Sequence, residues 1–141
     1  MSGVHETTLD ALASSLQAAL PQRLVRRSLP RDPAGMKAAL LLAGVVCVVA
    51  SGGGSFANWS GREGELGQMA VKLACFVKVE DKAPEVEVEQ AELALLADLL
   101  GWCQLVKADP LGDVVPLSWQ QSSQLEHPYG WLVLELSVRN L

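Results

Sequence analysis

The chain has 141 residues, of which 50% are hydrophobic and 19% are charged, with a formal net charge of −5. This length suits a single domain over residues 1–141 that buries about two-thirds of its unfolded surface, and the composition excludes a chain that is disordered throughout. The negative charge argues against a protein that wraps a nucleic-acid backbone, because such binding relies on Lys and Arg displacing counterions.

The three cysteines, Cys47, Cys75 and Cys103, are widely spaced and lie in or beside apolar runs. A thiol in such a run usually behaves as a small hydrophobe, so we expect a reducing compartment, no disulfide framework and no zinc site. The first ten residues lack the pattern of a secretory signal. The apolar run 38–50 has 13 residues, fewer than the ~20 of a membrane-spanning helix, and we expect it in the core.

The first expected element is a helix over residues 9–20, where leucines recur at helical spacing. Thr7 or Thr8 is its expected N-cap, and Pro21 ends it. A short edge strand follows at Leu24 and Val25. Its surroundings are basic, because four arginines occur with no acid before Asp32: Arg23, Arg26, Arg27 and Arg31.

The middle of the chain predicts a helix and a β-hairpin. Residues 33–42 favour one or two helical turns that end at Gly44, and 45–50 is β-branched and apolar, as in a central strand. Residues 51–67 contain six glycines, which predicts a long flexible loop. Residues 69–80 alternate strictly between two faces, so we expect a long strand that pairs with 45–50 as an antiparallel hairpin. If this strand lay wholly inside the core, Phe76 would be as buried as Leu73.

The last part of the chain predicts a helix from about 85 to 101, followed by strands. A short strand is expected at 102–106, mostly irregular chain at 109–128 with one strand near 114–120, and a well-defined final strand at 131–139. The element order α-β-α-β-β-α-β-β predicts an α+β fold: a mostly antiparallel sheet with a long β-hairpin and two longer helices packed on one face.

Patterns typical of catalytic sites are weak in this sequence. The Gly52–Gly54 run lacks the lysine, the GxGxxG spacing and the following helix of a phosphate-binding loop. His127 could pair with Ser122, Ser123 or a cysteine as a nucleophile, but a structural histidine that bonds a loop is the favoured interpretation. The acids of the long helix are expected to be solvated. We therefore expect no enzyme activity, no cofactor and no metal.

Charge is distributed unevenly along the chain. The arginine-rich segment carries no acid, whereas residues 80–98 carry seven acids and one lysine. Two such patches could meet head to tail between copies and build a ring. They could equally be two unrelated solvated faces.

The sequence SSQLEHPYGW at 122–131, followed by an alternating final strand, resembles the tail terminator (tail completion) proteins of long-tailed bacteriophages. The element order, the LPRD segment at 29–32 and the helix containing VEQAELALLADLL fit this resemblance over nearly the whole chain. The resemblance implies a structural subunit of a hexameric ring that caps the tail tube, ends tube growth and joins the tail to the head in the neck.

The resemblance also implies partners and a location. The partners are further copies of the chain, the tail tube protein and a head-completion or connector protein, with DNA passing through the lumen without specific binding and no membrane. The location is the virion tail, after assembly in the bacterial cytoplasm. The alternatives are another phage neck or minor tail protein, or a small cytoplasmic ligand-binding domain or enzyme that uses the Gly-rich loop and His127.

Two sets of residues are the hypothetical contacts. The inter-subunit set comprises the charged residues Arg23, Arg26, Arg27, Arg31, Glu85, Glu87, Glu89 and Glu92. The set expected to contact the tube or a neighbour lies in the Gly-rich loop and comprises Phe56, Trp59, Arg62, Glu63 and Glu65.

Overall fold

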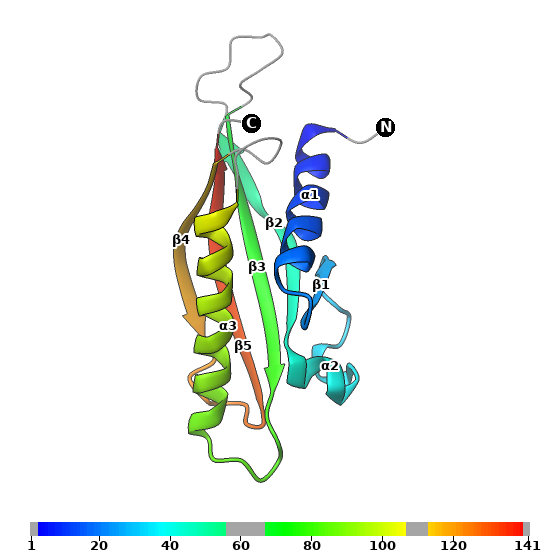
Figure 1. Ribbon diagram of the computed structural model, residues 1–141, viewed down its shortest axis with the longest axis vertical. Coiled ribbons are helices and arrows are strands. Elements are labelled where there is room, and N and C mark those ends of the chain that lie inside the picture. Colours follow the sequence, from blue (N-terminus) through cyan, green and yellow to red (C-terminus); the bar gives the residue numbers. More distant parts are fainter. Residues whose placement is uncertain (1–2, 56–66, 107–112, 140–141) are drawn as a thin grey trace.

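The computed structural model of the protein describes residues 3–55, 67–106 and 113–139 (Figure 1). The elements of these residues, in chain order, are α1 (Val4–Ala19), β1 (Leu24–Arg27), the 3-10 turn η1 (Pro33–Gly35), α2 (Ala38–Ala43), β2 (Val45–Ser55), β3 (Gln68–Lys78), α3 (Val86–Leu105), β4 (Asp113–Gln121) and β5 (Tyr129–Arg139). Apart from η1, this is the predicted order of helices and strands.

The strands form one sheet in the order β1-β2-β3-β5-β4. Neighbouring strands are antiparallel except β1 and β2, which are parallel because η1 and α2 return the chain to the end of the sheet where β1 began. The hairpin of β2 and β3 pairs Val45 with Phe76 and Ser55 with Gln68. The predicted α+β fold with a long β-hairpin is confirmed.

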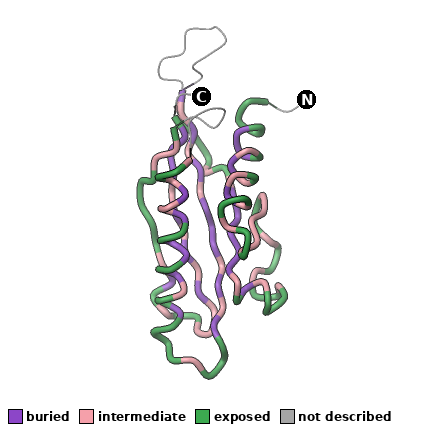
Figure 2. The backbone as a smooth tube through the Cα atoms, in the orientation of Figure 1, coloured by how far each residue is buried: buried purple, intermediate pink, exposed green. Residues whose placement is uncertain are grey.

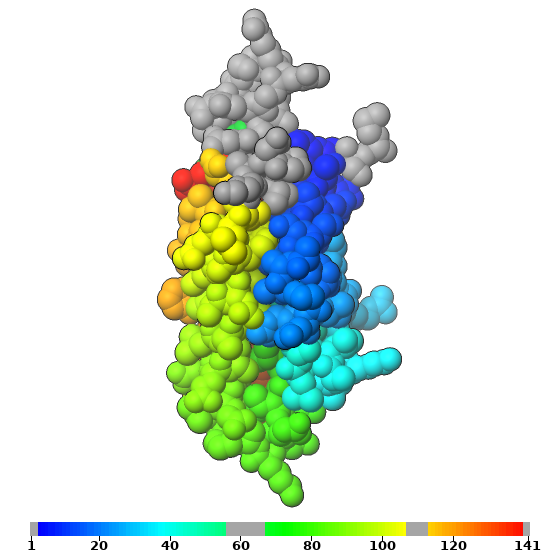
Figure 3. Space-filling model, in the orientation of Figure 1, coloured from blue at the N-terminus to red at the C-terminus, as the bar shows by residue number. Residues whose placement is uncertain are grey.

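The two longer helices, α1 and α3, cover the same face of the sheet (Figures 1 and 3). The indole Nε1 of Trp102 on α3 donates to Ser15 Oγ on α1 at 2.9 Å, which joins the two helices directly. Figure 2 shows buried residues running the length of the central strands beneath them. The fully buried side chains of this core include Leu12, Leu16, Val46, Val48, Val71, Leu73, Leu95, Leu99 and Val138.

The opposite face of the sheet has a second, smaller core at one end. Leu41 of α2 packs there with Val45, Cys47 and Ala74. Phe76 lies on this face and is half-buried, whereas Leu73 on the helix-covered face is fully buried. The hairpin is therefore not wholly enclosed by the core.

Two element boundaries differ from expectation near α1 and the hairpin. Helix α1 begins at Val4, so Thr8 lies inside it, and its hydroxyl donates to the Val4 carbonyl oxygen at 2.7 Å. Strand β2 continues to Ser55, although a loop was expected from residue 51. A register shift between Ala50 and Gly54 accommodates the glycines. Gly54 is required there, because a Cβ would lie 2.4 Å from the Gln68 carbonyl oxygen.

The strand expected at 102–106 is wrong, whereas the strand expected near 114–120 is present as β4. Helix α3 runs through Gly101 to Leu105, because burial of Trp102 against α1 outweighs the ~1 kcal/mol cost of a helical glycine. Residues 113–121 form a nine-residue strand despite Pro116. An edge strand tolerates proline, and β4 also has a register shift between Pro116 and Ser118.

The two edges of the sheet are closed in different ways. At the β1 edge, the side chain of Gln17 spans from α1: its Oε1 accepts a hydrogen bond from the Val25 amide at 3.0 Å. Its Nε2 donates to the carbonyl oxygens of Arg23, at 2.8 Å, and Leu20, at 3.2 Å. At the β4 edge, Pro116 has no N–H to offer.

Candidate interaction surfaces

The acidic end of the molecule is formed by the start of α3, the chain that leads into it from β3, and the β4–β5 turn (Figure 1, bottom). Glu85, Glu87 and Glu89, three of the predicted interface acids, are exposed there. Glu126 in the β4–β5 turn is exposed as well. Carboxylates from two separate parts of the chain thus meet at one end, as the charge pattern of α3 alone could not show.

Glu92, the fourth predicted interface acid, is 1% exposed and belongs to the interior. The expectation that it is solvated is wrong, because its carboxylate accepts hydrogen bonds from three groups: the Ser122 hydroxyl, the Trp131 amide at 3.0 Å and the Gln121 Nε2 at 3.3 Å. A buried carboxylate persists only where such partners replace water. Glu92 fastens both ends of the β4–β5 turn to α3.

The β4–β5 turn, residues 122–128, is fixed by further bonds. Ser123 and Gln124 adopt positive φ angles of 60° and 66°. The Gln124 Nε2 donates to Glu89 at 2.6 Å, and the His127 Nε2 lies 2.8 Å from the Ala83 carbonyl oxygen. His127 is therefore a structural histidine that bonds a loop, as the favoured interpretation predicted. The tip residue, Leu125, is 85% exposed.

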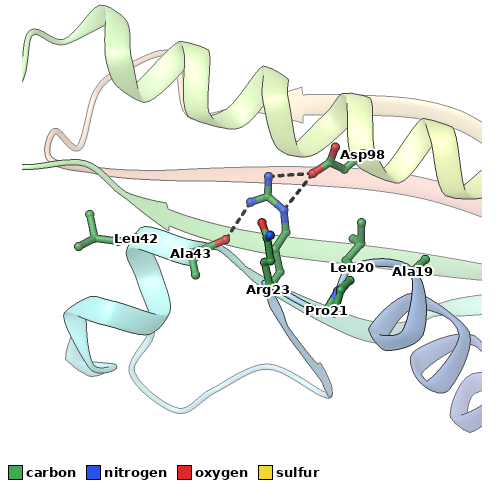
Figure 4. A pocket seen from close by; sticks show the side chains of 8 residues that line it. Ala19, Leu20, Pro21, Arg23, Leu42, Ala43 and Asp98 are labelled. Carbon is green, nitrogen blue, oxygen red and sulfur yellow. Dashed lines mark hydrogen bonds and ion pairs between the residues drawn. The ribbon is translucent and has the colours of Figure 1, made fainter.

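Two of the four predicted interface arginines form ion pairs within the chain. The Arg23 guanidinium donates from Nε at 3.1 Å and from Nη2 at 2.9 Å to Asp98 on α3, and from Nη1 at 2.9 Å to the Ala43 carbonyl oxygen (Figure 4). Arg27 pairs with Asp10 on α1. These arginines link β1 to the helices, so their charges are largely compensated within the molecule.

Arg26 and Arg31 differ from the other two arginines. Within the described part of the chain, neither has a carboxylate within ion-pair distance. Arg26 pairs in register with Cys47, which places it on the sheet face that carries α2. Arg31 is exposed just before η1. These two side chains are the charges of the basic segment that remain for a partner.

Two adjoining hollows lie where α1 ends, between α1 and α2. The first, of about 530 Å³, contains the Arg23–Asp98 pair (Figure 4). The second, of about 510 Å³, is lined by the apolar side chains of Pro21, Leu24, Leu40 and Ala43, together with Gln17, Gln22 and Arg23. Because Arg23 is already bonded on three nitrogens, neither hollow offers a free guanidinium to a small anion.

A third hollow, of about 230 Å³, opens on the sheet face opposite α1 and α3. Aromatic rings of Phe76, Tyr129 and Trp131 line it together with the acids Asp32 and Glu126. Lys78 Nζ lies 5.5 Å from the Tyr129 ring centre. Aromatic rings beside carboxylates suit cationic or apolar side chains rather than anions.

The cysteines are buried or partly buried, as expected. Burial raises the pKa of Cys47 to about 11, although the nearby Arg26 opposes the rise, and burial raises the pKa of Cys103 to about 11. Burial raises the pKa of Cys75 further still. Thiols that stay protonated at neutral pH are poor nucleophiles, so none of the three fits a catalytic pair with His127.

The residues predicted to contact the tube or a neighbour, 56–65, lie outside the described residues. The adjoining Gly52–Gly54 belongs to β2 and precedes a strand partner rather than a helix, so it lacks the geometry of a phosphate-binding loop. Among the residues described, no cluster of three or more His, Cys, Asp or Glu could hold a metal ion. No helix of the described ranges is long and apolar enough to cross a membrane.

Sequence reasoning missed Leu125 and the two hollows where α1 ends. The signal for Leu125 was a lone leucine in the polar run 120–127, at a position where neither helical nor strand periodicity places it in a core.

No protein-family model matches this sequence, and no curated protein matches it.

Proposed function

We propose that the protein is a structural ring subunit that caps the tail tube of a long-tailed bacteriophage and forms part of the neck joining tail to head. The proposal starts from the resemblance of the chain to tail terminator proteins. The element order on which the resemblance rests is present in the described residues. In this function the protein acts by binding and has no catalytic turnover.

The observation that carries the proposal is that one molecule carries exposed acids and exposed or half-buried arginines on different elements. Exposed acids gather where α3 begins, and the arginines without an ion-pair partner among the described residues, Arg26 and Arg31, belong to the segment around β1 and η1. Complementary patches at different places on identical subunits favour head-to-tail contacts, which close into a ring when the rotation permits. An acidic overall balance would let DNA pass without adhering to the lumen.

The proposal is tested with tail tube protein that polymerises on its own. Tubes are grown to a measured length, this protein is added, and fresh tube protein follows. Electron microscopy is expected to show a ring at the tube end and no further growth, whereas tubes without the protein lengthen. Continued growth at saturating protein, with no density at the tube end, would contradict the proposal.

A further inference from the structure

We propose that the β4–β5 turn, residues 122–128, is a docking knob whose tip Leu125 inserts into the hollow lined by Pro21, Leu24, Leu40 and Ala43 on a second copy of the chain. This inference rests on the proposed ring function, because it names the contact through which neighbouring copies meet.

The tip of the knob is an apolar side chain left in water. Leu125, at 85%, is the most exposed large hydrophobic residue of the described chain. Covering a leucine fully is worth about 1.5–3 kcal/mol. Single exposed leucines are common on protein surfaces, so exposure alone does not identify a contact. The second observation is the conformation of the backbone that precedes Leu125.

That backbone holds two successive residues, Ser123 and Gln124, in the left-handed region. For residues other than glycine this conformation costs roughly 1–2 kcal/mol each, and it persists only where the surroundings hold it, often where ligands bind. Here α3 holds the turn through Glu92 and Glu89. The tip is thus presented in one fixed shape, which lowers the entropy cost of binding.

The second hollow has the chemistry to receive such a tip. Its volume is about 510 Å³, and four of its lining residues are apolar. Arg26 lies two positions beyond Leu24 in β1 and therefore on the same face of the strand. The hollow is lined by Leu24, which shares its strand face with Arg26, and among the described residues Arg26 has no carboxylate within ion-pair distance. An apolar depression near such a charge complements a leucine followed by Glu126.

The knob and the hollow belong to different parts of the molecule, so one copy offers its knob to the next copy's hollow. Such a contact is heterologous: each subunit uses two different patches, and repetition of the contact produces a closed ring or an open filament. The acids of the knob end and Arg26 then serve one interface, with Leu125 as its apolar centre.

The test compares Leu125→Asp with Leu105→Asp by light scattering and sedimentation. Leu105 is 78% exposed at the other end of α3, so the control makes the same chemical change at a similar exposure. Leu125→Asp is expected to weaken self-association at least tenfold, and Leu105→Asp to leave it unchanged, with equal thermal stability in both. Equal self-association of Leu125→Asp and wild type would overturn the proposal that Leu125 docks into a second copy.

A cross-linking experiment tests the hollow separately. Gln22 is exposed at the edge of the hollow, so a chain carrying both Gln22→Cys and Leu125→Cys is expected to form a ladder of disulfide-linked copies under mild oxidation. A mixture of the two single variants is expected to give linked dimers, and either single variant alone to give no Gln22–Leu125 link. Failure of the ladder in a chain that still self-associates would overturn the assignment of the hollow.

The two proposals fail in different ways. If wild type stays monomeric both alone and with tube protein, the ring function and the knob are both wrong. If wild type associates and caps tubes while Leu125→Asp does the same, only the knob is wrong.

Discussion

At the scale of single residues, Glu92 departs most from what its sequence position implies. It sits among the acids of α3 that face solvent, yet its carboxylate is buried and accepts three hydrogen bonds. Helical spacing explains the position, because Val88, Glu92, Leu95 and Leu99 share the face that packs on the sheet. A glutamate at this position, rather than an apolar residue, is explained only by the hydrogen bonds that it accepts from the two ends of the β4–β5 turn.

The stability of the fold is expected to depend on this carboxylate. Glu92→Ala leaves the Ser122 hydroxyl and the Trp131 amide unpaired in the interior, so it should destabilise the protein by about 2–4 kcal/mol. Urea unfolding measures the change. Glu87→Ala, at an exposed position of the same helix, is the control and should change stability by about 0.5 kcal/mol or less. Similar changes in stability for the two variants would contradict the role of Glu92 in holding the β4–β5 turn to α3.

The buried thiols give the protein a defined sensitivity to alkaline pH. The pKa of Cys47 and of Cys103 is about 11 in the folded chain, whereas an unfolded cysteine has a pKa near ~8.5. Below the unfolded pKa both states hold the proton; above it only the folded state does, so stability falls as the pH rises toward 11.

The measurement compares urea midpoints at pH 8 and pH 10.5 for wild type and for the double variant Cys47→Ala, Cys103→Ala. The variant is expected to lose less stability over this interval. Equal losses in the two proteins would contradict the assignment of the alkaline response to Cys47 and Cys103.

At the scale of elements, the sequence predicts strands and helices best where the two faces differ in chemistry. The alternation of residues 69–80 predicts β3, which ends at Lys78, because one face packs under the helices and the other does not. The pattern fails at the end of α3, where Gly101 resembles a helix stop but Trp102 packs beneath α1. It also cannot identify the partners of Arg23, because Asp98 lies 75 residues away in sequence.

Two glycines of this α3–β5 region are expected to respond oppositely to alanine. At Gly130 in β5, a Cβ would lie 2.5 Å from the Glu92 carboxylate and 2.7 Å from Val88. Gly130→Ala should therefore cost about 1–3 kcal/mol. At Gly101 nothing lies within 4 Å of the added carbon, so Gly101→Ala should stabilise the helix by about 0.5–1 kcal/mol. Thermal unfolding of both variants checks the sign, and a stabilising Gly130→Ala would refute the close packing.

At the scale of the whole molecule, the position of the unpaired charges matters more than their number. The predicted basic patch of four arginines contains two that link β1 to the helices. A charge reversal that leaves the fold intact should therefore target Arg26 and Arg31, since reversing Arg27 would also break its bond to Asp10. The sequence predicted four arginines as one set. Only the fold separates Arg23 and Arg27, which bond within the chain, from the two that have no ion-pair partner among the described residues.

Self-association is expected to weaken with salt. Raising the ionic strength from 0.1 M to 1 M shortens the screening length from ~10 Å to ~3 Å, so the attraction between the acidic end and the free arginines falls. Sedimentation velocity should show a shift toward smaller species in wild type. The double variant Arg26→Glu, Arg31→Glu is expected to sediment as a small species at both salt concentrations. Stronger association of wild type at high salt would indicate an interface without charge complementarity.

The closed edges of the sheet have a consequence for how this protein behaves when it is crowded or partly unfolded. Open strand edges are the templates on which fibres grow. Here the outward amide of Val25 is occupied by the Gln17 side chain, and the opposite edge strand carries Pro116 and an irregular register. Neither edge offers an uninterrupted ladder to an incoming strand. We therefore expect little growth of amyloid-like fibres from the folded chain at either side of the sheet.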